Sequence, residues 1–139
     1  MSTVIFKSMN KSFISIVFVI TILISPNCSK RQEKICISHT TAKVTNVSGP
    51  NNVLVNQETN LTVKYYLDNG CGKFEGLEST SNDYNIKISL IAKYEGCVCT
   101  DILLGGQIVY KFKPLKTGVY YLNFLQPDKT YLSDTITVN

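Results

Sequence analysis

From Lys34 to the C-terminus, apolar and polar residues alternate with a period of two, and this pattern constrains the fold more than any other feature. In residues 60–67 it places Leu61, Val63, Tyr65 and Leu67 on one face of the chain. Successive side chains of a strand point to opposite faces, so such runs are typical of half-buried strands in an antiparallel sheet. No segment shows a convincing helical stripe.

Four later segments repeat this alternation, and β-branched and aromatic residues fill them. They are residues 86–92, 108–112, 119–124 and 132–138, with Ile86, Ile88, Leu90, Ala92, Ile136 and Val138 predicted to point inward. Turn-forming sequences separate the segments at residues 48–52, 68–70, 105–106 and 126–129. About seven short strands in a segment of this length predict an all-β, immunoglobulin-like antiparallel β-sandwich.

Tyr120 stands in a Gly-Val-Tyr sequence at the start of the penultimate predicted strand. This pattern resembles the tyrosine corner of immunoglobulin-like domains, in which the phenol hydroxyl bonds the backbone at the edge of a sheet. The alternative is that Tyr120 only packs in the core. The chain has no tryptophan, which excludes a true antibody-type domain.

The N-terminal region contains an uncharged apolar run at residues 13–24, preceded by Lys7 and Lys11. Twelve residues rise only about 18 Å as a helix, which is well short of a hydrocarbon core of about 30 Å. This length is typical of the hydrophobic region of a signal peptide rather than of a membrane span. Translation could start at Met1 or at Met9.

Cys28 follows this apolar run closely, and no alanine precedes Ala42 to form the cleavage site of a soluble secreted protein. A cysteine in this position resembles a bacterial lipobox, although Ser25, Pro26 and Asn27 replace the usual leucine and small residues. We therefore expect residues 1–27 to be a lipoprotein signal peptide, Cys28 to carry lipid, and residues 28–34 to link it to a sandwich at 35–139. The alternatives are an unmodified secreted protein and an uncleaved anchor.

The charge of the mature chain is small and scattered. Two of the fourteen basic residues lie in the signal, which leaves twelve against ten acidic residues. Nucleic-acid binding requires a clustered basic face, so we expect no nucleic-acid partner. The only basic cluster, at residues 30–34, is next to the expected lipid and is interpreted as a solvated leader.

Four further cysteines, Cys36, Cys71, Cys97 and Cys99, predict two disulfides in an exported chain. If the strand continued through Cys97 and Cys99, both thiols would project from one face and would be too strained to bond each other. Each then pairs with Cys36 or Cys71. Of the two arrangements, Cys71–Cys97 with Cys36–Cys99 is the preferred expectation.

A metal site is the alternative interpretation of these cysteines. Cys71, Cys97, Cys99 and the only histidine, His39, could supply ligands for Cu(I) or Zn(II). A third interpretation is that the thiols are free and reactive. Taken alone, His39 is expected to be a surface or edge-strand residue.

Two cysteine-containing blocks carry a family resemblance. Gly70-Cys71-Gly72-Lys73-Phe74 and residues 92–100, followed by 121–124 and 134–138, are similar to small envelope lipoproteins of the flavobacteria, in the Bacteroidetes. The resemblance covers residues 60–139. It implies an envelope location and an immunoglobulin-like shape, and it implies no activity.

The sequence offers no catalytic motif. It has one histidine, dispersed acidic residues, and no nucleophile elbow, zinc-protease, phosphate-loop or EF-hand sequence. We therefore expect a non-catalytic module that carries no cofactor beyond its lipid. It would be anchored at the outer membrane facing the periplasm and would present residues 68–83 as a loop to an envelope partner. A periplasmic copper- or zinc-binding protein is the alternative.

Overall fold

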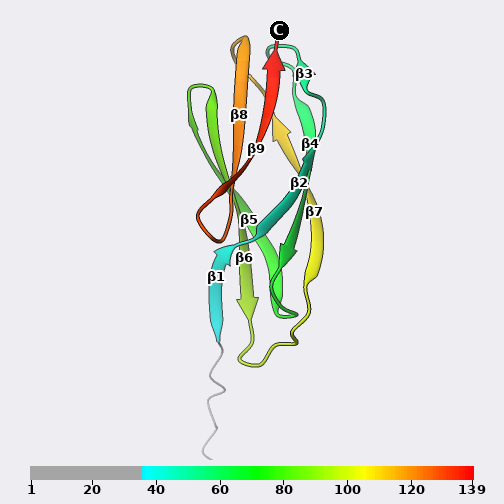
Figure 1. The fold of residues 1–139 in the computed structure, drawn as a ribbon, viewed down its shortest axis with the longest axis vertical. Helices are drawn as coiled ribbons and strands as arrows, with labels where there is room; N and C mark the ends of the chain where they lie inside the picture. The colour runs from blue at the N-terminus through cyan, green and yellow to red at the C-terminus, as the bar shows by residue number, and fades with distance from the viewer. Residues whose placement is uncertain (1–35) are drawn as a thin grey trace, which may run out of the picture. The chain divides into compact units, whose positions relative to one another are not determined.

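Nine β-strands form the regular structure of residues 36–139, the part of the chain that the computed structural model describes (Figure 1). No helix in this part is long and apolar enough to span a membrane. The expected signal peptide, Cys28 and the whole linker of residues 28–34 lie outside the described residues. The strands are β1 (Ile37–Thr41), β2 (Lys43–Ser48), β3 (Asn52–Val53), β4 (Thr59–Leu67), β5 (Gly72–Asn82), β6 (Asn85–Glu95), β7 (Leu104–Phe112), β8 (Gly118–Leu125) and β9 (Tyr131–Val138).

The strands form two sheets that face each other. One sheet has three strands in the order β2-β4-β7, and the other has six strands arranged around β6. Strand β5 pairs along one edge of β6. On the other edge, β1 pairs with residues 91–95 and β8 with residues 85–88, after which come β9 and β3. The predicted β-sandwich is therefore confirmed.

The first two strands belong to different sheets, although a single residue separates them. Ala42 is buried, and its N–H donates a hydrogen bond to the carbonyl of Leu90 at 2.8 Å. This contact holds the chain against β6 at the point where it crosses from the six-stranded sheet to the three-stranded sheet. One N-terminal run thus contributes an edge strand to both layers.

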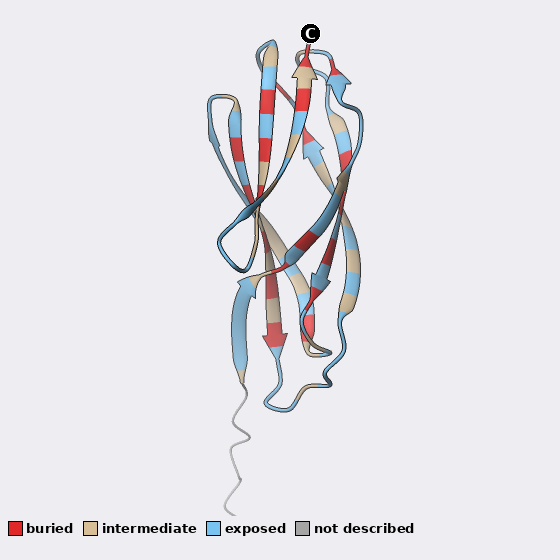
Figure 2. Cartoon of the chain, in the orientation of Figure 1, coloured by how far each residue is buried: buried red, intermediate tan, exposed pale blue. Residues whose placement is uncertain are grey.

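Burial follows the alternation of the sequence, and buried positions recur along the strands of both layers (Figure 2). All ten of the named inward-facing residues of β4, β6 and β9 are buried, which confirms that part of the prediction. The largest fully buried side chain is Phe124 of β8, whose ring meets that of Tyr110 edge-on with centroids 6.3 Å apart. The core therefore fills the space between the sheets.

Strand β5 contradicts the expectation of a loop over residues 68–83. Only the turn before Gly72 is irregular, and residues 72–82 pair with β6 along its length. A β-bulge between Phe74 and Gly76 breaks the alternation, and the last five side chains of the strand are exposed. An exposed edge strand needs no inward apolar set, so periodicity did not reveal it.

Gly105 and Gly106 also differ from the prediction, because they lie within β7 rather than in a turn. They pair with Tyr66 and Tyr65 of β4. A Cβ atom at Gly106 would lie 2.5 Å from the Tyr65 ring, and one at Gly105 would lie 3.1 Å from the Tyr66 ring. The glycines leave room for cross-strand tyrosines, a known way of covering glycine in an edge strand.

Two strand pairs are parallel, whereas the sequence predicted an antiparallel sandwich. These are β6 with β8 and β3 with β9; all other pairs are antiparallel. After β6 the chain crosses to the other sheet to form β7. It then returns to the first sheet, where β8 lies beside β6. A connection of this kind, unlike a hairpin, allows parallel neighbours.

Phe124→Ala should destabilise the domain by about 3–5 kcal/mol, because it removes a fully buried ring and leaves a cavity. Urea unfolding measures the difference in free energy of unfolding. Leu115→Ala is the matched control, since Leu115 is 72% exposed, and it should stay within about 0.5 kcal/mol of the native chain. A Phe124→Ala variant as stable as the control would contradict the described core.

Candidate functional site

Three segments meet at one end of the sandwich, which we call the cystine end. They are the residues just before β1, the turn between β4 and β5, and the loop of residues 96–103 between β6 and β7 (Figure 1). Two disulfides join them, Cys36–Cys97 and Cys71–Cys99, with Cα–Cα distances of 4.9 and 5.5 Å. The predicted disulfides are present, and each connects segments that are distant in sequence.

The pairing is the reverse of the preferred expectation, which joined Cys71 to Cys97 and Cys36 to Cys99. The sequence argument against a Cys97–Cys99 bond assumed a strand continuing through both cysteines, but β6 ends at Glu95 and Gly96 has a φ of 147°. The choice between the two remaining pairings follows instead from the sheet topology. Strands β1 and β5 lie on opposite edges of β6, so Cys36 and Cys71 reach its end from opposite sides.

Backbone hydrogen bonds set the positions of the two partners. The N–H of Gly96 donates to the carbonyl of Cys36 at 2.9 Å, which brings Cys36 beside the first cysteine of the loop. On the other edge, the N–H of Glu95 donates to the carbonyl of Cys71 at 3.3 Å. Gly96 is required here, because a Cβ atom would lie 2.8 Å from the sulfur of Cys71. The turn and loop therefore form one crosslinked unit.

The metal interpretation of Cys71, Cys97, Cys99 and His39 does not fit this arrangement. The cysteine sulfurs are in disulfides and supply no thiolate ligand. His39 lies on β1, with its side chain 52% exposed, and its Nε2 is 3.1 Å from a carboxylate oxygen of Glu75. Among residues 36–139, no three histidine, cysteine or acidic side chains are grouped as metal ligands.

Tyr120 combines both of the roles considered from the sequence. Its side chain is buried, and its ring packs edge-on against Phe112 and Tyr84, with centroid distances of 5.2 and 5.0 Å. Its hydroxyl also donates to the carbonyl of Lys116 and accepts from the N–H of Lys116, both at 3.2 Å. The phenol thus fixes the loop that leads into β8, as a tyrosine corner does.

A cleft of about 600 Å³ lies at the end of the sandwich opposite the cystine end. Lys116 Nζ donates to Asp83 Oδ1 at 3.3 Å, and this hydrogen bond and charge raise the pKa of Lys116. Lys111 pairs with Glu58 at 3.2 Å, while Lys113 adds a further positive charge. The lining residues are Ser79, Ser81, Asp83, Ile86, Tyr110, Lys111, Phe112, Lys113, Pro114, Leu115, Lys116 and Tyr120. The cleft has an excess of basic residues and accessible hydroxyl groups.

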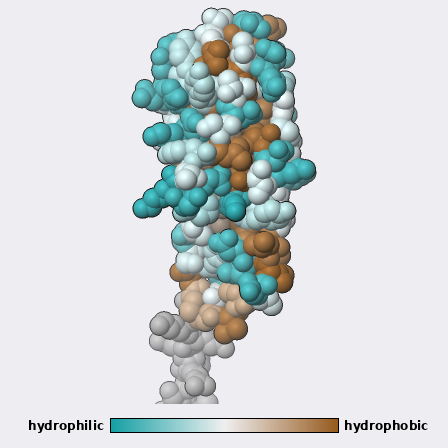
Figure 3. All heavy atoms as spheres, in the orientation of Figure 1, coloured by the Kyte–Doolittle hydropathy of each residue, from teal (hydrophilic) through white to brown (hydrophobic). Residues whose placement is uncertain are grey.

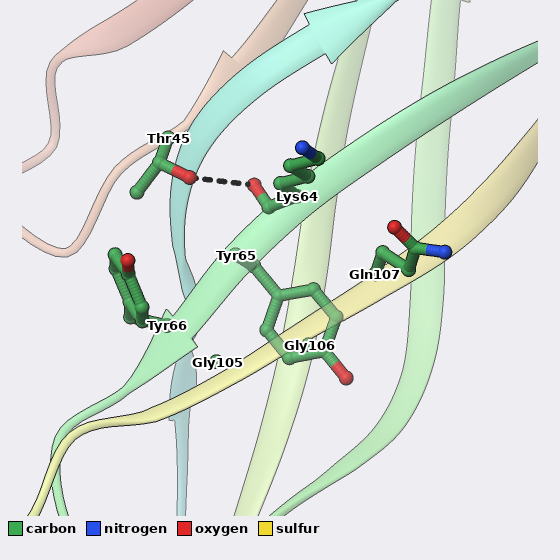
Figure 4. Close-up of a pocket in the computed structure, with 7 residues that line it drawn as sticks. All are labelled: Thr45, Lys64, Tyr65, Tyr66, Gly105, Gly106 and Gln107. Atoms are coloured by element: carbon green, nitrogen blue, oxygen red, sulfur yellow. Dashed lines mark hydrogen bonds between the residues drawn. The ribbon is translucent and has the colours of Figure 1, made fainter.

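A second hollow, of about 360 Å³, lies over β4 and β7 and is lined by residues shown in Figure 4. Gly105 and Gly106 are among its lining residues. Burial raises the pKa of Tyr65, and Thr45 Oγ1 donates to the carbonyl of Lys64 at 3.3 Å. No acidic side chain lines it, so it offers shape and hydroxyl groups rather than acid–base chemistry.

The sequence analysis singled out Cys97 and Cys99 in the loop of residues 96–103, but it missed the three exposed apolar side chains of this loop. Val98 is 94% exposed, Leu103 69% and Ile102 52%. The sequence does contain a signal for their exposure. These residues lie next to two cysteines in a segment without alternation, so neither sheet can bury them. These residues belong to the cystine end rather than to the core.

A family model described as the ORF11 beta-sandwich domain matches residues 61–138, more than half of the chain. The match begins in β4 and ends in the last strand, so it includes the central strand β6. No curated protein and no solved structure matches the chain. The family match supports the β-sandwich part of the sequence resemblance, and its description states no activity.

Tyr120→Phe should lower the free energy of unfolding by about 1–1.5 kcal/mol, because it removes the hydroxyl that bonds the backbone of Lys116. Tyr121→Phe is the control: Tyr121 is the next residue, is 45% exposed, and should show little change. Urea unfolding compares the two variants. Equal effects would show that the hydroxyl of Tyr120 contributes no specific stability.

Cys36→Ser should leave Cys97 as the free thiol and cost about 4 kcal/mol, because the crosslink closes a sequence separation of 61 residues. Alkylation of the native variant followed by fragment mass spectrometry identifies the labelled cysteine. Cys71→Ser is the matched variant and should expose Cys99 instead. A label on Cys99 in the Cys36→Ser variant would contradict the described pairing.

Proposed function

We propose that this chain, which belongs to the ORF11 β-sandwich domain family, is a lipid-anchored, non-catalytic binding module of the bacterial cell envelope. The observation that carries the proposal is the disulfide between Cys36 and Cys97, formed by the first residue that the structure describes. It links the start of the domain covalently to its cystine end. With lipid on Cys28, the domain would be attached at the cystine end and free at the other.

The two disulfides support export from the cytoplasm. Disulfides persist in oxidising compartments such as the bacterial periplasm and are rare in reducing cytosol. Two such crosslinks favour an exported chain, and residues 13–28 resemble the signal of a bacterial lipoprotein. We place the protein at the outer membrane facing the periplasm, in agreement with its resemblance to flavobacterial envelope lipoproteins.

The proposed tether is short. Cys36 is eight positions after Cys28 in the sequence, a distance of at most about 29 Å when the chain is fully extended. Lipid chains on Cys28 would hold the protein stably at the membrane, because each buried methylene contributes about 0.8 kcal/mol. The folded domain then needs no membrane-spanning segment of its own.

Binding suits the described surface better than catalysis does. General acid–base catalysis uses a titratable side chain held beside a second reacting group. His39 instead lies exposed on an edge strand, with its Nε2 3.1 Å from a carboxylate oxygen of Glu75. Asp83 and Glu58 are paired with lysines at the surface. These side chains stabilise charge locally and do not converge on a reacting atom.

The basic cleft is the surface that we propose for a partner. It lies at the end opposite Cys36, where the anchor would not obstruct it. Lys111 pairs with Glu58 and Lys116 with Asp83, which leaves the charge of Lys113 in excess. Charge complementarity favours an acidic segment of another envelope protein. This replaces the earlier expectation of a binding loop at residues 68–83, which forms β5 instead.

Cys28→Ser should move the protein from the membrane fraction to the soluble fraction, because the thiol that carries the lipid is lost. Ser29→Ala, the neighbouring substitution, should leave it in the membrane. Fractionation and intact-mass measurement of protein from a bacterial host follow both the location and the acyl mass. Native protein that retains its leader, or that has an unmodified Cys28, would overturn the proposed anchor.

A further inference from the structure

The cystine end presents an exposed apolar surface that the fold does not use. We define the apolar tip as Ile37, Val98, Ile102 and Leu103, whose exposed fractions are 50, 94, 52 and 69%. Figure 3 shows hydrophobic atoms gathered at this end of the described domain. Val98, Ile102 and Leu103 lie in one eight-residue loop, and Ile37 starts the strand that follows Cys36. Single exposed apolar residues are ordinary, whereas exposed apolar patches mark sites of interaction with a protein or a membrane.

The tip is held in place rather than left free to fold back. Val98 stands between Cys97 and Cys99, each of which is in a disulfide to a different segment. Thr100 accepts backbone hydrogen bonds from Gly70 at 2.9 Å and Ile102 at 3.0 Å. These constraints keep the loop in a shape that exposes its apolar side chains to whatever lies beyond the cystine end.

The distance between the tip and the proposed lipid anchor indicates which surface the tip faces. Cys36 is bonded to Cys97, the neighbour of Val98, and is eight residues from Cys28. A lipid on Cys28 would therefore hold Val98 within a few tens of ångströms of the bilayer surface. The intervening segment carries Lys30, Arg31 and Lys34 against Glu33, and the loop carries Asp101. The excess of positive charge favours an anionic lipid surface.

We propose that the apolar tip inserts into the bilayer interface beside the lipid anchor. Apolar side chains of an interfacial segment enter the boundary between headgroups and acyl chains, and their burial adds to the attraction of nearby basic residues for anionic lipid. The inference rests on the proposed lipid anchor. A second contact point restricts rotation about the tether and directs the basic cleft away from the membrane.

A single tryptophan tests this insertion directly, because the chain contains none. Full-length protein carrying Val98→Trp is expressed in a bacterial host and purified from its membranes. It is then reconstituted into phosphatidylcholine–phosphatidylglycerol vesicles with or without brominated acyl chains. Leu115→Trp is the matched control, since Leu115 is an exposed apolar residue at the opposite end. Emission wavelength, quenching and co-flotation with the vesicles are measured for each variant.

We expect both variants to float with the vesicles, and only Val98→Trp to emit at shorter wavelength. Its quenching by brominated lipid should exceed that of Leu115→Trp by at least about twofold, since the bromines lie in the acyl region that the tip enters. Water-like, unquenched emission from a floating Val98→Trp variant would overturn the insertion and leave the anchor intact.

Two other outcomes would also overturn the inference. A short-wavelength emission that brominated lipid does not quench would show that the tip is covered by protein, either a second copy or a co-purified partner. Failure of both variants to float would remove the lipid anchor, and with it the inference that depends on the anchor. Flotation thus reports on the proposed function, while quenching reports on the tip.

Discussion

The pairing of β6 on both of its edges is the constraint on which the rest of the structure depends. One edge is occupied by β5, and the other is divided between β1 and β8. This arrangement brings Cys36 and Cys71 to opposite sides of the same strand end, and so determines which cysteine each can reach. It also places the buried residues of β6 in the core between the two sheets.

The strands that bury one face could be predicted from the sequence, because burial imposes a period of two on β4, β6, β8 and β9. Strand β5 could not, since its edge position and its bulge remove the need for alternation. The glycines of β7 suggested a turn, but their role is to admit the rings of Tyr65 and Tyr66. The position of a glycine in the sequence does not show whether it forms a turn or leaves room for a ring on the neighbouring strand.

The candidate site was predictable in composition but not in arrangement. Oxidised cysteines follow from their even number in a chain expected to be exported. The side of β6 that each cysteine approaches depends on the topology of the sheet. The basic cleft assembles residues from β5, β7 and the loop before β8, which are far apart in sequence. Most of the apolar tip belongs to one loop of the sequence. Its proposed role depends on the disulfide that places this loop beside the start of the domain.

The Cys36–Cys97 crosslink also has a mechanical consequence. The five paired residues of β1 follow Cys36 directly, so without the crosslink a pull on the N-terminal segment would load their hydrogen bonds one after another. With it, force passes through sulfur into the end of β6 and the loop beyond, and β1 is shielded from being peeled away. A domain attached by its N-terminus can thus resist shear without a strong first strand.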